Sequence, residues 1–315
     1  MNIDISLKKV YNMVDLIKQI EPIFFLKKLK ISSINLNIDI DVKFVNPGYL
    51  TLIVAACNWA KENGIIIEYN INNDSRNYYP YRINFFKLLG AKVYEPFYRR
   101  FSNNGRFIEI TPLPFDNMKK IMIDTNVIDE IIRIIKNNYK IESSIYTSLN
   151  YCLWEQVDNI ANHSSIKGTG YTVAQHYPTN KKILLCVVDT GIGVYEALTN
   201  SPGTKYKSLT YKEAISDCIK EKVTNGKGMG NGLYHSAKFI QANKGDFVLY
   251  SGNYYIEIGN GVIRETKRGP YWHGTIIFEK ICTDVSVDFS ETFDNCDIPT
   301  SVLECDDILD GLWEN

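Results

Sequence analysis

Three short motifs, in a fixed order between residues 155 and 233, constrain the fold of this chain more than any other feature. The first runs from Glu155 to His163 (Glu-Gln-Val-Asp-Asn-Ile-Ala-Asn-His) within a segment of helical pattern that begins at Ser143. Glu155 and Asn159 share one face of such a helix, so both can point at the same ligand. This pairing suits a polyphosphate and its metal ion, and it predicts Asn159 as a ligand of Mg²⁺.

The second motif, Asp189-Thr-Gly191-Ile-Gly193, follows the apolar run Ile183–Val188. The run predicts a buried strand, which places Asp189 at the end of that strand. There its carboxylate can accept a hydrogen bond from an exocyclic amine. Gly191 and Gly193 have no side chains, so the backbone can pass close to a flat base.

The third motif is a glycine ladder, Gly226-Lys227-Gly228-Met229-Gly230-Asn231-Gly232-Leu233, which leads into a helical pattern ending at Ile240. Backbone N–H groups of such a ladder and the helix N-terminus converge on an anion. Alone, the ladder would also fit a flexible loop or a degenerate dinucleotide fingerprint, but no second strand with a ribose-binding acid follows it. The Gly-Lys-Ser/Thr of a Walker loop does not occur in the sequence. Together the three motifs predict an ATP site.

With these motifs, residues 143–281 resemble the GHKL superfamily of ATPases and kinases (gyrase, heat-shock chaperone, histidine kinase and MutL types), whose ATP-binding module is the Bergerat fold. The resemblance implies Asn159 as the Mg²⁺ ligand, Glu155 as the general base and Asp189 as the partner of the adenine amine. It implies that Thr275 helps to bind adenine through water. The expected nucleotide-binding set comprises Asn159, Asn162, His163, Asp189, Gly191, Gly193, Gly226, Lys227, Gly228, Met229, Gly230, Asn231, Gly232, Leu233 and Thr275. His163 is open between a phosphate contact and packing on the helix face.

The N-terminal half has a different pattern, in which strand and helix segments alternate. Residues 34–42 alternate apolar and polar side chains, the turn Asn46-Pro47-Gly48 follows, and Tyr49 to Asn63 has helical pattern. This order resembles STAS domains, small α/β modules that partner the anti-sigma-factor serine kinases, and the Glu-x-x-x-Asn-x-x-x-His pattern also resembles those kinases. The phosphorylatable serine of the STAS family corresponds to Pro47, so a STAS-like domain here could not be switched at that position.

The predicted fold class is α/β, as an α+β sandwich in three parts. Residues 1–125 form a STAS-like regulatory domain, and residues 126–282 form a GHKL ATP-binding domain with a mixed sheet covered by helices on one face. Residues 283–315 form a tail with ten acidic residues and no Lys or Arg. The polar stretch 194–225 is a candidate lid over bound nucleotide. Turns are predicted at residues 252–253 and 268–270.

Composition excludes several other classes of function. A net charge of -1 gives no electrostatic footprint for nucleic acid. We expect no membrane segment, because no apolar stretch approaches the roughly 20 residues that a membrane helix needs. The seven cysteines are scattered without a CxxC pair, which is typical of reduced thiols in a cytoplasmic protein.

The motifs leave the reaction open. The sequence disfavours autophosphorylation of the histidine-kinase type, which needs an acceptor histidine before the ATP module, because the first histidine of the chain is His163, inside that module. Glu155 could activate water for slow ATP hydrolysis that drives a conformational switch in signalling or defence. It could instead accept the proton of a partner protein's serine or threonine, which would make the chain a protein kinase. A third possibility is an ATP-gated interaction module without turnover. A protein partner and a homodimer are both expected by analogy.

Overall fold

The structure is a computed structural model that describes residues 1–74, 77–100, 105–116, 121–122, 126–140, 143–163, 169–224, 232–288 and 292. Within these residues the strands form two sheets. The first is a parallel three-stranded sheet of β1 (Asn2–Ser6), β2 (Ser33–Asp39) and β3 (Ile66–Asn72). The second is a seven-stranded sheet in the order β5 (Ile121–Met122), β4 (Phe107–Asp116), β6 (Thr169–Tyr177), β7 (Lys182–Val188), β10 (Lys267–Cys282), β8 (Asp246–Gly259) and β9 (Val262–Ile263).

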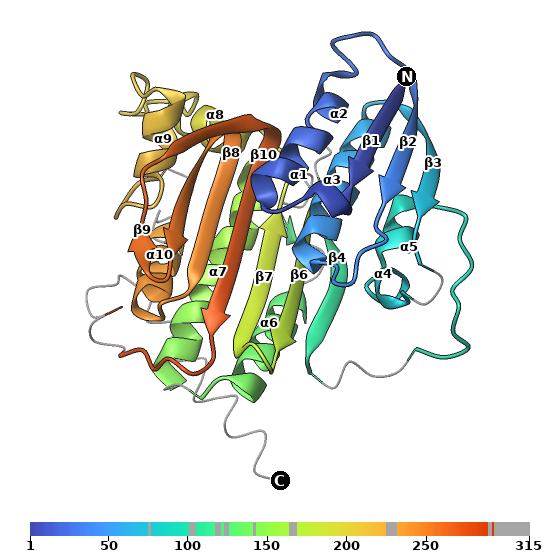
Figure 1. Cartoon of the computed structure of the whole chain (residues 1–315). Coiled ribbons are helices and arrows are strands. Elements are labelled where there is room, and N and C mark those ends of the chain that lie inside the picture. Colours follow the sequence, from blue (N-terminus) through green and yellow to red (C-terminus); the bar gives the residue numbers. More distant parts are fainter. Residues whose placement is uncertain are drawn as a thin grey trace.

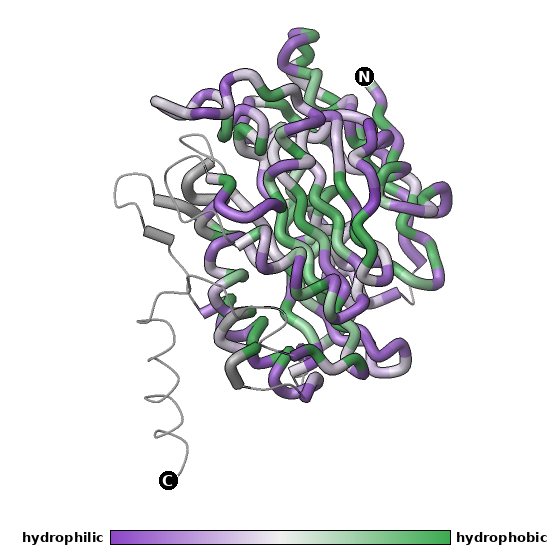
Figure 2. The backbone as a smooth tube through the Cα atoms, turned by 90° about the vertical axis from the view of Figure 1, so that its left-hand side faces the viewer, coloured by the Kyte–Doolittle hydropathy of each residue, from purple (hydrophilic) through white to green (hydrophobic). Residues whose placement is uncertain are grey.

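The helices separate the two sheets and cover the far face of the larger one (Figure 1). The N-terminal half holds η1 (Leu7–Lys9), α1 (Met13–Ile20), α2 (Pro22–Phe25), α3 (Pro47–Glu62), α4 (Tyr79–Arg82) and α5 (Phe85–Leu89). The C-terminal half holds α6 (Asn126–Asn138), α7 (Ser143–His163), α8 (Gly193–Thr199), α9 (Tyr211–Asp217) and α10 (Gly232–Ala242). Figure 2 shows apolar residues concentrated on the strands inside the molecule. None of the helices in the described part of the chain has the length and apolar character that crossing a bilayer requires.

The helix α3 lies between the two sheets. Its sequence from Leu50 to Cys57 is apolar almost all round, and every one of those residues is buried. A helix with this composition needs cover on all sides, which a sheet on each flank provides. At its start, Asn46 accepts a hydrogen bond from the backbone of Gly48 (2.9 Å), and a Cβ built at Gly48 would lie 2.4 Å from the ring of Phe278 on β10.

One hydrophobic core therefore joins the two halves of the chain. It contains Ile5 and Leu36 from the small sheet together with Val173, Val188 and Trp272 from the large one. A second core lies on the other face of the large sheet, under the helices α6, α7 and α10. The expected helix cover of one sheet face is thus only part of the arrangement, because the N-terminal half covers the opposite face. Pro47, in the first turn of α3, is itself buried there.

The sequence predicts a mixed sheet for the ATP module, and this detail is wrong for the described strands. Every pairing in the seven-stranded sheet is antiparallel. Short connections, such as the one between Tyr177 and Lys182, join neighbouring strands directly and leave no room for the crossover that parallel pairing needs. The coarser prediction of an α/β class with helices packed on sheets is confirmed.

Two predicted turns are absent from the structure, because the chain continues as strand through both. Residues 252–253 lie inside β8 and residues 268–270 lie inside β10. The two strands pair across this region with register shifts, which absorb the glycines and the proline. Asn253 donates to the carbonyl oxygen of Gly269 (3.3 Å), so side chains replace part of the interrupted backbone ladder.

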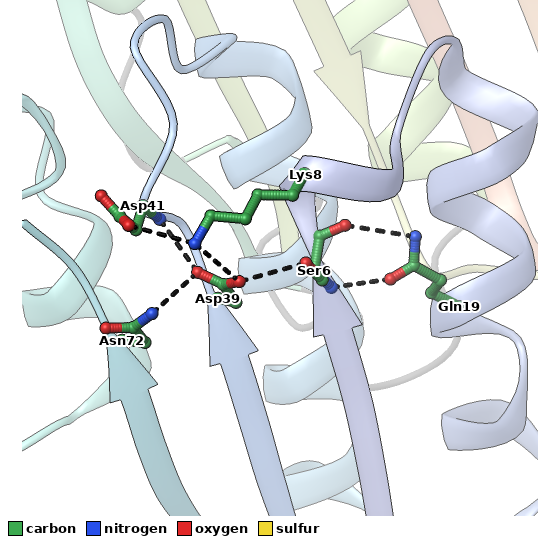
Figure 3. A network of polar contacts seen from close by, with 6 residues as sticks. All are labelled: Ser6, Lys8, Gln19, Asp39, Asp41 and Asn72. Carbon is green, nitrogen blue, oxygen red and sulfur yellow. Dashed lines mark hydrogen bonds and ion pairs between the residues drawn. The ribbon is translucent and has the colours of Figure 1, made fainter.

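A polar network joins the carboxyl ends of the three parallel strands (Figure 3). Asp39, at the end of β2, accepts hydrogen bonds from Asn72 (3.1 Å) and Ser6 (3.3 Å), and Lys8 bridges Asp39 (3.3 Å) and Asp41 (3.0 Å). These groups are partly exposed, so each ion pair contributes little to stability. The network provides partners for the polar side chains at this edge of the small sheet.

Candidate functional site

Hydrogen bonds fix the direction in which α7 crosses the large sheet. Tyr146, in its first turns, contacts the carbonyl oxygen of Tyr139, and the hydroxyl of Tyr139 contacts the carbonyl oxygen of Val285, just beyond the end of β10. Farther along α7, Gln156 donates to Glu279, within β10 (2.8 Å). The helix α7 therefore runs from the carboxyl end of β10 toward the end of the sheet where β7 finishes.

The helix α10 runs in the opposite direction. Asn243, just past its end, bonds to the backbone of Cys282 at the carboxyl end of β10 (2.6 and 2.9 Å). Ser236, one turn into α10, bonds to Gln156 (2.9 Å), and Gly232 begins the helix. Because β7 ends at Val188, the start of α10, the end of α7 and the end of β7 all face the same end of the sheet.

Asp189 and Thr275 lie side by side at this end, Asp189 directly after β7 and Thr275 within the neighbouring strand β10. The backbone N–H of Asp189 donates to the carbonyl oxygen of Thr275 (2.9 Å). The Asp189 carboxyl accepts hydrogen bonds from the N–H of Gly191 (2.7 Å) and from the backbone and hydroxyl of Thr275. A carboxylate has about four lone-pair positions, so it can accept one further donor. Burial raises the pKa of Asp189 to about 6, opposed by these hydrogen bonds.

Beside this pair the backbone packs too tightly for side chains. A Cβ at Gly193, where φ is +78°, would lie 2.6 Å from the hydroxyl of Ser251, and a Cβ at Gly274 would lie 2.3 Å from the carbonyl oxygen of Asp189. Ser251 donates to the carbonyl oxygen of Gly274 (2.7 Å) and accepts from the N–H of Val194 (3.0 Å). Gly193 therefore begins α8 directly against β8 and β10.

Glu155 and Gly232 bring the first and third motifs into contact. A Cβ built at Gly232 would lie 2.2 Å from the Cβ of Glu155, so only glycine allows α10 to begin this close to α7. Tyr151, one turn before, donates to the Glu155 carboxylate (3.1 Å). Asn159 follows one turn later on α7 and is partly exposed. The carboxylate, the carboxamide and the helix start thus share one end of the helical layer.

Several predicted residues cannot be placed. Residues 225–231, with Gly226, Lys227, Gly228, Met229, Gly230 and Asn231, lie outside the described residues, as does most of the acidic tail. Asn162 and His163 lie on α7, but their side chains are not described. Leu233 is placed in the first turn of α10 and is partly buried against the second core.

The candidate lid is packed more firmly than its polar sequence indicates. Its first helix, α8, is absent from the sequence prediction, and its second, α9, ends at Asp217. Leu198, Ile215 and Ile219 are buried in the second core. Residues 194–219 are therefore docked on the large sheet, and a lid that opens as one piece over 194–225 does not fit this packing.

An aromatic cluster, missing from the sequence prediction, connects the N-terminal half to Asp189. The indole N–H of Trp272 donates to the carbonyl oxygen of Asp189 (3.2 Å), and the Trp272 ring meets Phe24 of α2 edge-on at 5.0 Å. Phe24 also meets Trp59 of α3 (5.2 Å), and Glu21 accepts from the backbone of Tyr271 (2.6 Å). The predicted turn at residues 268–270 obscured this strand, although its run of aromatic residues is typical of a buried strand.

No protein-family model, curated protein or solved structure matches this chain.

Proposed function

We propose that the chain binds ATP with Mg²⁺ at the end of the large sheet where β7, β10, α7 and α10 converge, and hydrolyses it slowly as a conformational switch. The observation that carries the proposal is the arrangement of the three motifs. Asp189 and Thr275 share hydrogen bonds on adjacent strands, and Glu155 touches Gly232 at the same end of the sheet.

The Asp189 carboxylate suits an adenine amine better than a guanine carbonyl. Three donors already converge on its carboxylate, which keeps capacity for one more donor but offers nothing to an acceptor. The backbone at Gly193 and Gly274 packs closely against Ser251 and Asp189, which holds this end of the sheet in place. A heterocycle with an exocyclic amine is the ligand class that matches the remaining acceptor position of Asp189.

The helical layer supplies groups suited to the phosphate end of the ligand. Asn159 would hold Mg²⁺ through its carboxamide oxygen, and the start of α10 would direct backbone N–H groups at the phosphates. When bound, the ion neutralises charge that develops on the transferring phosphoryl group. Glu155, oriented by the hydroxyl of Tyr151, would accept the proton of an attacking water.

A route for the switch is supported by the aromatic cluster. Trp272 bonds to the backbone of Asp189 and packs on Phe24 of α2. A ligand that shifts Asp189 would therefore also displace the helices of the N-terminal half. Those helices lie between the two sheets, where small displacements move both. A protein partner, or a second copy of the chain in a homodimer, would then bind the N-terminal half differently in the two states.

The test follows the terminal phosphate of labelled ATP in the presence of Mg²⁺. We expect free phosphate to appear slowly with the wild-type chain. In Glu155→Ala, release should fall by about 100-fold or more while ATP affinity stays within about twofold, because a general base acts on the chemical step. Glu130→Ala, which removes an exposed acid on α6, is the matched control and should change neither quantity. Phosphate release that is equally fast without Glu155 would refute the proposal, and label transferred to a protein would favour the kinase reaction instead.

A further inference from the structure

An acidic side chain lies inside the apolar layer between the large sheet and its helices. Glu279, on β10, is 5% exposed and faces the same core as Ile277 and Ile281. Alternation along this strand places all three on one face, which is otherwise apolar. Glu279 is distinct from the residues assigned to the nucleotide, and its role does not depend on ATP binding.

Glu279 belongs to a buried hydrogen-bond network of three side chains that links three elements. The Nε2 atom of Gln156 on α7 lies 2.8 Å from a carboxyl oxygen of Glu279 and 2.9 Å from the hydroxyl oxygen of Ser236 on α10. Gln156 is 1% exposed and Ser236 is 3% exposed. This hydrogen-bond network thus connects α7 and α10 to β10, and it lies next to the contact between Glu155 and Gly232.

A cavity adjoins this hydrogen-bond network. Its volume of about 10 Å³ is close to the space that one water molecule needs. Its other walls are apolar except for the thiol of Cys152, and they come from α6, α7, β7, α10 and β10: Ile135, Leu149, Cys152, Leu153, Leu185, Phe239 and Ile281. No cationic side chain lines it among the described residues. An ionised Glu279 would therefore be a buried charge without a counter-ion, which is costly.

The amide of Gln156 can serve either protonation state of Glu279. With the carboxylate, the amide NH₂ donates to Glu279 and Ser236, and the amide oxygen has no hydrogen-bond partner among the described residues. With the carboxylic acid, a rotated amide places its oxygen at the same point, where both the acid O–H and the serine O–H donate to it. The NH₂ group then faces the cavity, where a water can accept its bond. The protonated state therefore gives the amide oxygen of Gln156 two direct partners and avoids a buried charge without a counter-ion.

We propose that Glu279 is a proton-binding site. While its carboxyl group is neutral it holds α7 against α10, and when it releases its proton to solvent the contact between the two helices loosens. Gln156 transmits the change, since it follows Glu155 directly in α7. Glu279 is thus a positioning residue for Glu155 and Gly232. In agreement with the geometry, burial raises the pKa of Glu279 to about 7, and the hydrogen bond from Gln156 opposes this rise.

The direction of the pH effect follows from this arrangement. Between about pH 4.5 and 7 the folded chain keeps a proton on Glu279 that the unfolded chain has lost, so stability falls as pH rises through this window and levels off above it. In Glu279→Gln the site cannot ionise. We expect the wild-type unfolding constant, relative to that of Glu279→Gln, to increase by about 100-fold between pH 5 and 8. Glu265→Gln, at an exposed position, is the control and should keep the wild-type profile.

Two measurements on the full chain test the proposal. The carboxyl carbon resonance of Glu279, followed by NMR in the wild type, should titrate with a midpoint between pH 6 and 8. The protection of the amides of Ser236 to Phe239 against hydrogen exchange, taken relative to the intrinsic exchange rate at each pH, should fall above that midpoint in the wild type and not in Glu279→Gln. A midpoint near 4.5, or exchange that does not change with the titration, would overturn the proposal, and neither readout requires nucleotide. If Glu279→Gln fails to fold, the wild-type resonance and exchange still decide.

Discussion

Replacing Gly232 by alanine tests the contact on which the catalytic end of the site depends. The added Cβ would lie 2.2 Å from the Cβ of Glu155, whereas carbon atoms normally pack about 3.5–4 Å apart. The helices α7 and α10 must therefore separate by roughly 1.5 Å. Overpacking of this kind costs about 1–3 kcal/mol. Helix propensity alone predicts the opposite sign, a gain of up to about 1 kcal/mol.

Urea unfolding of Gly232→Ala should show a net loss of about 1–2 kcal/mol, and phosphate release should fall because Glu155 is displaced. A double-mutant cycle isolates the contact. Glu155→Gly removes the opposing Cβ, so the cost of Gly232→Ala should largely vanish in that background. Glu155→Ala keeps the Cβ and should leave the cost unchanged, which makes it the matched control. The packing described for α7 and α10 would be refuted if Gly232→Ala were as stable as the wild type. It would also be refuted if Gly232→Ala cost the same free energy of unfolding in the Glu155→Gly and Glu155→Ala backgrounds.

The other predictions concern the ligand groups around Asp189 and Asn159. Asn159→Ala should weaken nucleotide binding only when Mg²⁺ is present, as measured by calorimetry with and without the metal. Trp272→Phe keeps the ring contact with Phe24 but removes the N–H bond to Asp189, so urea unfolding should show a loss of about 1 kcal/mol, the typical net value of one hydrogen bond. ADP affinity should also fall as pH drops through about 6, because protonation of Asp189 fills the position that accepts the amine. The same raised pKa makes Asp189 lower the stability of the free protein as pH rises from about 4 to 6. Affinity that is constant from pH 5 to 8 would contradict the assignment of Asp189.

The predictions from sequence succeeded where local pattern and burial agree. The apolar run 183–188 placed Asp189 at a strand end, and the helical pattern from Ser143 to His163 matches α7 in both bounds. In each case the signal lies within one element.

The predictions failed where contacts between distant elements decide the outcome. Glycine and proline at residues 252 and 270 are turn signals, yet cross-strand pairing keeps both positions inside long strands. The sequence of α3 indicates a helix buried on all sides but does not predict which second sheet covers it. The alternation in β10 places Glu279 on a buried face, a signal that was present and not used. The partners of Trp272 and Gln156 come from elements far away in sequence, and no local pattern predicts them.

The most direct test of the account compares adenine and guanine nucleotides by calorimetry with Mg²⁺. The wild-type chain should bind ADP at least about tenfold more tightly than GDP, because Asp189 accepts from an amine and repels a carbonyl oxygen. Asp189→Asn should lose that preference while it remains folded in urea titrations, since its amide presents NH₂ where the carboxylate presented an acceptor. No binding of ADP by the wild type, or an unchanged preference in Asp189→Asn, would contradict a nucleotide site at the end of β7.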